Sequence, residues 1–188
     1  PDLQLQSITG AARNFSFAGM KKLTVTSFSK YLRTVPAVPA VPADILYVFH
    51  GEEQFFIDQL ITELENFIFK EPADRQLNCH TFYGTENSLS EIISNCMSYS
   101  MFGTKKLVVV KDFDKFKSNT LDSLIKYVQH PQKSTVLVFT AEKWGKSKVY
   151  QEILEQAVSV SCKPLKEEEL YGWLYAKARN ADIKAERE

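Results

Sequence analysis

Two junctions between a predicted strand and a predicted helix carry residues that could bind a phosphate group. At the first, Gly51 follows the apolar run "ILYVFH" and precedes "EEQFFID". A phosphate-binding loop here would read GxxxxGK[ST], because its backbone N–H groups, lysine and hydroxyl together hold phosphates and magnesium. Glu52 and Glu53 begin the helix instead. They suit the positive end of the helix dipole but would repel phosphate. We therefore predict a degenerate phosphate-loop position with no bound nucleotide or other cofactor.

The second junction is "TAEKWGKSK", in which Gly145, Lys146 and Ser147 form the back half of a phosphate-binding loop. The glycine that should stand five residues before Gly145 is Thr140. A glycine turn with Ser147 as the helix cap explains this stretch more simply. A nucleotide-binding ATPase that uses Lys146 and Ser147 is kept as an alternative.

The spacing of the remaining candidate residues supports neither a metal site nor acid–base catalysis. The histidines fall in three separate segments, with no HExxH motif: His50, His80 and His130. No serine lies in a GxSxG motif. The cysteines are odd in number and form no CxxC, which favours packing roles in a reducing compartment: Cys79, Cys96 and Cys162. We expect no catalytic residue and no metal.

The composition is that of a globular protein. Hydrophobic residues make up 44% of the 188 residues and charged residues 24%, and 23 basic residues balance 23 acidic ones. Overall charge therefore does not indicate a dominant nucleic-acid-binding face, although a local basic patch remains open. No apolar run approaches the ~20 residues of a membrane helix, and we expect a cytoplasmic protein with no membrane segment.

Strands and helices are predicted to alternate along most of the chain. The expected strands are five short apolar runs: 45–50, 77–84, 105–112, 134–141 and 158–162. The expected helices follow them with apolar residues at helical spacing: 52–69, 88–97, 120–130, 147–157 and 166–180. Ser88 with Glu91 three residues later predicts an N-cap for one of these helices. The third and fourth strands are continuously apolar, which favours a five-stranded parallel sheet with helices on both faces.

The first 43 residues differ from the rest. "SFSKYLRTV" predicts one short basic helix, and "VPAVPAVPA" is an exact triplet repeat. Proline at every third position excludes a helix or a central strand and favours an extended polyproline conformation. We interpret residues 1–43 as an N-terminal extension with a semi-rigid proline-rich linker, and a proline-motif ligand for another protein as the alternative.

The stretch "SYSMFGTKKLVVVKD" poses a different question, because Met101 and Phe102 stand side by side at a predicted turn before Gly103. Either both side chains fold back into the core or another molecule covers them. A flexible apolar residue next to an aromatic one at an exposed turn is typical of a pocketed interface.

Five motifs together resemble the delta subunit of bacterial DNA polymerase III. They occur in order and with compatible spacing, and they cover residues 44–188: "ILYVFHGEEQFFIDQLITELE", "MFGTKKLVVVKDFDKF", "LIKYVQHPQKSTVLVFTAEKW", "KVYQEILEQAVSVSCKPLKEEELYGWL" and "ADIKAE". In that family a strand ends in Gly-Glu-Glu and runs into a helix.

The resemblance implies an AAA+-like α/β fold, of the P-loop-NTPase type but without a working phosphate loop. Residues 44–163 would be the clamp-binding domain, and 164–188 the start of a helical lid domain. The subunit would be non-catalytic, with ATP hydrolysis in its partners. Those partners would be the sliding clamp (the beta subunit), the gamma/tau and delta prime subunits through a further carboxy-terminal domain, and primed DNA in the assembled complex.

The resemblance also implies a contact site. In this family a hydrophobic pair at the end of a helix, commonly Leu-Phe after a serine, enters a pocket of the clamp. The matching positions are Ser100, Met101 and Phe102. Methionine in place of leucine conserves volume and should keep the contact. Ser98, Tyr99 and Lys105 would form the rim, and binding would favour an opened clamp.

Two other interpretations remain open from the sequence. The chain could be a generic α/β interaction module, in which case Met101 and Phe102 would be buried. It could also bind DNA directly through a run of lysines interrupted by acidic residues, which we interpret mainly as solvated surface: Lys105, Lys106, Lys111, Lys115 and Lys117.

Overall fold

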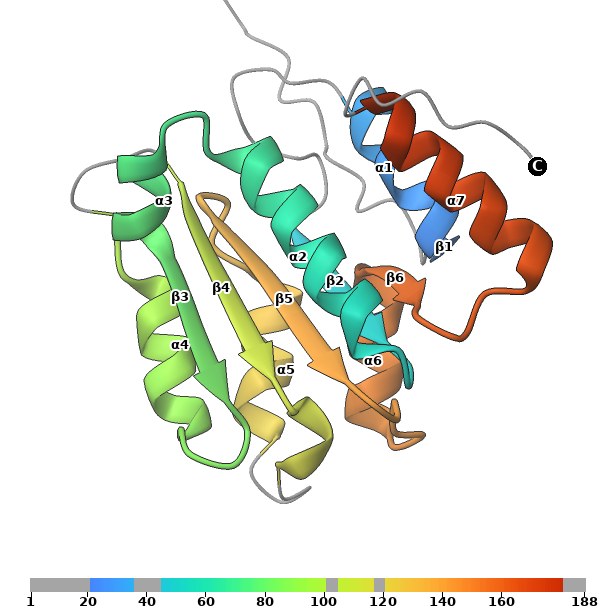
Figure 1. Ribbon diagram of the computed structural model, residues 1–188. Helices are drawn as coiled ribbons and strands as arrows, with labels where there is room; N and C mark the ends of the chain where they lie inside the picture. Colours follow the sequence, from blue (N-terminus) through green and yellow to red (C-terminus); the bar gives the residue numbers. More distant parts are fainter. Residues whose placement is uncertain (1–20, 36–44, 101–104, 117–120, 181–188) are drawn as a thin grey trace, which may run out of the picture.

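The computed structural model describes residues 21–35, 45–100, 105–116 and 121–180. They form a parallel sheet of six strands in the order β1-β6-β2-β5-β4-β3 (Figure 1). The strands have these bounds: β1 Lys21–Thr24, β2 Leu46–His50, β3 Cys79–Tyr83, β4 Lys106–Lys111, β5 Thr135–Ala141 and β6 Val158–Ser161. The helices are these: α1 Val25–Thr34, α2 Gln54–Ile68, α3 Pro72–Asn78, α4 Leu89–Met97, α5 Asp122–Gln129, α6 Lys148–Gln156 and α7 Glu167–Asn180. A 3₁₀ turn, Phe113–Lys115, follows β4.

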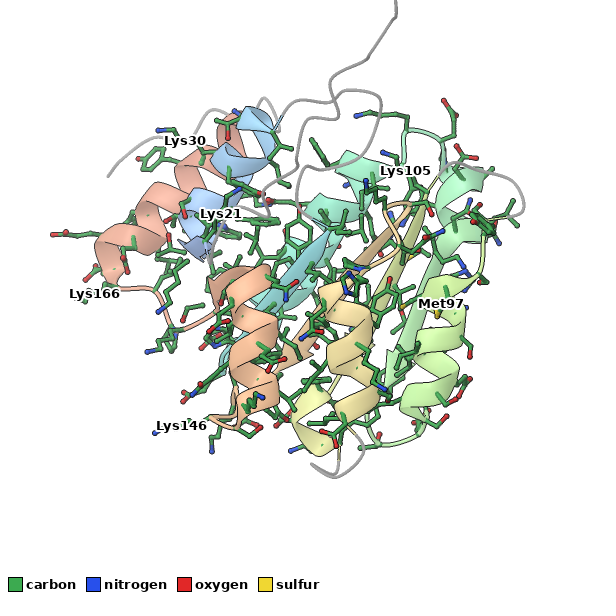
Figure 2. The ribbon with its side chains drawn as sticks, turned by 180° about the vertical axis from the view of Figure 1, so that it is seen from behind. Lys21, Lys30, Met97, Lys105, Lys146 and Lys166 are labelled. Carbon is green, nitrogen blue, oxygen red and sulfur yellow. The ribbon has the colours of Figure 1, made fainter. Side chains whose placement is uncertain are left out.

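Helices cover both faces of the sheet, as the continuously apolar strands predicted. On one face α4, α5 and α6 pack over a core that contains Val108 and Val110 of β4 (Figure 2). On the other face α1 and α2 pack over a second core, which contains Leu107 and Val109 of the same strand (Figure 1). Successive residues of a strand point to opposite faces, so a strand buried on both faces must be apolar throughout.

The predicted number of five strands is wrong by one, because β1 adds a sixth at the edge of the sheet beside β6. Lys21 of β1 lies opposite Val158 of β6 in parallel register. The strand has only four residues, "KKLT", and Leu23 is its one apolar side chain. So short a segment shows no alternation from which a strand could be predicted.

The short basic helix expected near residues 27–35 is α1, and it packs against the sheet. Phe28 is fully buried, with its ring edge-on to Tyr47 at 6.2 Å and to Phe49 at 5.3 Å between centroids. Residues 21–35 therefore form part of the sheet or pack against it, although their composition predicted that they form part of an N-terminal extension. The proline triplets lie outside the described residues, save Val35, and the domain boundaries remain predictions.

The last helix, α7, lies beside α1 (Figure 1) and contacts α2 through Trp173. Trp173 packs edge-on against Phe55 at 5.8 Å and Phe56 at 5.5 Å between ring centroids. Lys177 Nζ donates to Glu63 Oε1 at 2.6 Å. An aromatic cluster and a charge-assisted hydrogen bond thus hold α7 against α2. None of the described helices is both long and apolar enough to cross a membrane.

Candidate functional site

The predicted degenerate phosphate-loop position follows β2, and two of its backbone donors are already used. The Gly51 N–H donates to the Ala141 carbonyl at 3.1 Å, and the Glu53 N–H donates to the Cys162 carbonyl at 3.1 Å. Gly51 has φ +142°, and a Cβ atom there would overlap the Cys162 carbonyl oxygen. A phosphate loop needs free amides directed at its ligand. Here Ala141 at the end of β5 and Cys162 just after β6 accept those hydrogen bonds, and Cys162 fills the space beside Gly51.

His50 closes the end of the same strand and has a structural environment. Its Nε2 lies 3.2 Å from Ser159 Oγ, and its carbonyl accepts from the Cys162 N–H at 2.7 Å. Burial, and to a smaller extent the nearby charge of Lys163, lowers the pKa of His50 below its ordinary value. A neutral, hydrogen-bonded imidazole at this place joins β2 to β6.

The second phosphate-loop candidate is a turn held by aromatic residues. Ser147 is the N-cap of α6 as predicted, although its side chain makes no capping hydrogen bond. Trp144 stacks on Phe113 at 5.4 Å and donates its Nε1–H to the Tyr150 carbonyl at 3.1 Å. A Cβ at Gly145 would lie 2.8 Å from the Tyr150 ring. The glycine is therefore explained by close packing.

No group of histidine, cysteine or acidic residues in the described part of the chain could hold a metal ion. The three cysteines are free thiols, and burial is the main cause that raises the pKa of each to about 12: Cys79, Cys96 and Cys162. Such thiols are protonated and unreactive.

The segment predicted to contact the clamp begins at the end of α4. This helix starts at the predicted N-cap, where Ser88 Oγ accepts from the Glu91 N–H at 3.2 Å. Leu89, Ile92 and Cys96 face the core. The helix ends at Met97, and the chain continues in an extended conformation at Ser98. Met101 and Phe102 lie outside the described residues, so their burial is not tested.

Two large side chains just before that pair are exposed to solvent. Tyr99 is 81% exposed and Met97 is 62% exposed. Figure 2 shows Met97 on α4, on the side of the view opposite Lys146. The sequence indicated Tyr99 as a site residue but not Met97. Helical spacing alone would not have revealed it, because Met97 follows Ile93 by four residues and Ile93 packs against the core.

The backbone beneath these side chains is held from two sides. Lys106 Nζ donates to the carbonyls of Asn95 and Ser98, both at 2.8 Å, and to Ser98 Oγ at 2.6 Å. Ser100 Oγ donates to Asn78 Oδ1 at the end of α3. The structure thus connects two predicted site residues, Ser98 and Ser100, to Lys106 and Asn78, neither of which the sequence placed at the clamp-contact site.

The predicted rim role of Lys105 is wrong, because its side chain is buried. Its Nζ has no hydrogen-bond partner among the described residues, and burial lowers its pKa to about 8. Lys106 is buried as well, so the first two lysines of the basic run are not solvated surface. Lys111 pairs with Asp58 at 3.0 Å, and Lys115 lies 3.6 Å from Asp114. Lys117 is outside the described residues.

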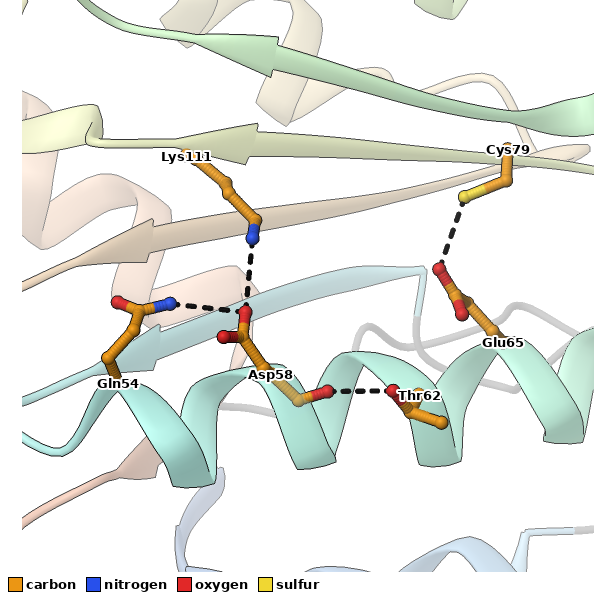
Figure 3. A network of polar contacts seen from close by, with 6 residues as sticks. All are labelled: Gln54, Asp58, Thr62, Glu65, Cys79 and Lys111. Atoms are coloured by element: carbon orange, nitrogen blue, oxygen red, sulfur yellow. Dashed lines mark hydrogen bonds and ion pairs between the residues drawn. The ribbon is translucent and has the colours of Figure 1, made fainter.

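Helix α2 is connected to the neighbouring strands and to α3 by polar contacts. Figure 3 shows Asp58 accepting from Lys111 of β4, and Glu65 Oε1 accepting from the Cys79 thiol of β3 at 3.4 Å. Glu65 also pairs with Arg75 of α3 at 2.6 Å. The Glu65 carboxylate therefore fixes α3 on the sheet and, with it, Asn78 beside Ser100.

Comparison with solved structures defines the class of fold. The chain superimposes on a Thermotoga maritima DNA polymerase III gamma subunit-related protein with a TM-score of 0.54 and 14% identity, covering 85% of this chain and 54% of that one. A point mutant of Thermotoga maritima RuvB gives a TM-score of 0.51 and 12% identity, covering 85% of this chain and 52% of that one. These likenesses, with a parallel sheet covered on both faces, show an AAA+-like fold.

A sequence profile for "DNA polymerase III, delta subunit" matches residues 47–163. The chain belongs to this family of clamp-loader subunits. It is also similar in structure to the Bacillus subtilis DNA clamp loader delta protein, with a TM-score of 0.68 and 18% identity, covering 84% of this chain and 48% of that one. The chain thus spans about half the length of that protein. No curated protein sequence matches it significantly.

Proposed function

We propose that this chain is the part of a clamp-loader delta subunit that binds the sliding clamp, and that residues 98–102 make the contact. The observation that carries the proposal is the exposed side chain of Tyr99, with exposed Met97 just before the segment, on a backbone held by buried Lys106 and Asn78. Met101 and Phe102 follow directly and add two further apolar side chains. Aromatic and methionine side chains are enriched in the centres of interfaces, where they fill pockets.

The action would be mechanical. A ligand shifts a conformational equilibrium only through its different affinities for the two states. Met101 and Phe102, seated in a pocket of the clamp, would therefore bind the open clamp more tightly than the closed one. Nucleotide hydrolysis would belong to the gamma/tau subunits, because the amides of Gly51 and Glu53 are already paired. Contacts with delta prime and with primed DNA would come in the assembled cytoplasmic complex.

Calorimetric titration of the cognate sliding clamp tests this function. Replacing both Met101 and Phe102 by alanine should weaken binding by at least ~2 kcal/mol, as for interface hot spots, and leave the melting temperature unchanged. Equal binding by the two forms would refute the proposed contact. A double variant that unfolds would instead assign the pair to the core. Binding of ATP at millimolar concentration would support the alternative nucleotide-binding function.

A further inference from the structure

Lys106 occupies an unusual position for a lysine. It is the first residue of β4, only 4% of it is exposed, and its three hydrogen bonds all go to the end of α4. The last carbonyls of a helix lack partners within the helix and carry the negative end of its dipole. An ammonium group with three donors satisfies several of these acceptors at once. Lys106 therefore caps the carboxyl end of α4, as a glycine C-cap does in other helices.

Burial alone would drive this lysine toward its neutral form, and its pKa is indeed lowered, chiefly by burial. A buried ammonium is tolerated where hydrogen bonds and an opposing dipole offset its desolvation. The acceptors at Asn95 and Ser98 supply both. If position 106 only filled the core at the start of a buried strand, we would expect an apolar residue there. The lysine is explained by the hydrogen bonds that it donates to the end of α4.

Asn78 holds the same segment from the other side. It is the last residue of α3 and only 3% exposed, and its Nδ2 donates to the Asp74 carbonyl at 3.0 Å. This leaves Oδ1 directed at the Ser100 hydroxyl. The Arg75–Glu65 ion pair fixes α3 in turn. Residues 98–100 are therefore anchored at both ends, to β4 through Lys106 and to α3 through Asn78.

We propose that Lys106 and Asn78 are positioning residues for clamp binding, which fix residues 98–100, the segment that precedes Met101 and Phe102 in the sequence. The inference rests on the proposed function of that pair. Ordering a flexible segment during association reduces affinity, and a segment ordered beforehand avoids that loss. Neither side chain needs to touch the clamp, because each acts through the conformation of residues 98–100.

The variant Lys106→Met tests the first anchor, because it keeps an unbranched side chain only one atom shorter and removes all three donors. We expect clamp affinity to fall by about tenfold or more. This corresponds to the conformational free energy of ordering one additional backbone residue on binding. Lys111→Met is the matched control at the other end of the same strand, where it removes the Asp58 hydrogen bond. It should leave clamp affinity unchanged.

A double-mutant cycle tests the second anchor with smaller changes. Asn78→Ala and Ser100→Ala each remove one side of the same hydrogen bond, so their effects on clamp affinity should not add. Hydrogen exchange of the free chain gives a readout that general destabilisation would not produce. The amide of Ser98, which donates to the Ser94 and Asn95 carbonyls, should exchange faster in each of these variants and in Lys106→Met, while the amides of β5 stay protected.

The possible outcomes distinguish a failure of the positioning role from a failure of the proposed clamp contact. If the double alanine variant of Met101 and Phe102 loses binding while Lys106→Met and Asn78→Ala bind like the unaltered chain, the positioning role is refuted and the clamp contact stands. If the double variant binds normally, the clamp contact itself is refuted. Additive losses from Asn78→Ala and Ser100→Ala would also overturn the shared anchor.

Discussion

Replacing Phe28 by alanine tests whether residues 21–35 fold as one unit with the sheet. The Phe28 ring is fully buried against Tyr47 and Phe49 of β2. Truncating such a side chain removes its transfer free energy and leaves a cavity, so the free energy of unfolding should fall by about 3–5 kcal/mol. Urea unfolding followed by circular dichroism measures the loss. Tyr99→Ala, at an exposed position, is the control and should change stability by less than about 0.5 kcal/mol.

The slope of the unfolding curve distinguishes two ways in which Phe28→Ala could act. If α1 stays docked over the cavity, the dependence of stability on urea is unchanged, because the same surface is exposed on unfolding. If α1 undocks first, the slope decreases and the loss is limited to the free energy of docking. A loss below about 1 kcal/mol with an unchanged slope would refute the conclusion that α1 belongs to the core.

Three further predictions concern the strand ends and the thiols. Gly51→Ala should destabilise the protein by about 2 kcal/mol or more, because φ is positive and the Cβ would overlap the Cys162 carbonyl; Gly172→Ala, on an open face of α7, should be neutral or stabilise by up to about 1 kcal/mol in the same urea titration. The pKa of His50 is lower in the folded than in the unfolded state, so the unfolded chain binds the extra proton and stability should fall as pH drops through the unfolded value of 6.5 toward the folded one. His50→Asn should flatten that part of the stability–pH curve, and an unchanged curve would assign the acid sensitivity elsewhere. Cys96 and Cys162, buried and with raised pKa, should react with a thiol reagent far more slowly in the native protein than in urea, and equally fast reaction in both would contradict their burial.

Sequence patterns predicted most of the fold because the signals are local. The apolar runs at 105–112 and 134–141 each report a strand buried on both faces, and Ser88 with Glu91 reports a helix start. Two elements that were not predicted, β1 and α3, carry only weak local signals. β1 is short and half-charged, and α3 has seven residues with only Pro72 at its first turn as a signal.

The residues of the candidate site are also of two kinds: some are indicated by the local sequence, and others are brought together only by the fold. The acidic pair after Gly51 and the apolar pair at 101–102 are visible in the sequence, and they lead to the two functional predictions. The anchors are not visible. Asn78 lies 22 residues from Ser100, and lysine is so seldom buried that two adjacent lysines predict surface. Lys106 and Asn78 contact residues 98–100 only because the fold brings α3, α4 and β4 together.

The most direct test of the clamp contact is site-specific photo-crosslinking to the cognate sliding clamp. A photoreactive phenylalanine analogue would be placed at Tyr99 and at Phe102, and as a control at Phe55, an exposed aromatic residue on α2. The account predicts clamp adducts from positions 99 and 102 and none from position 55. Adducts from position 55 alone, or from none of the three while the clamp is bound, would contradict it.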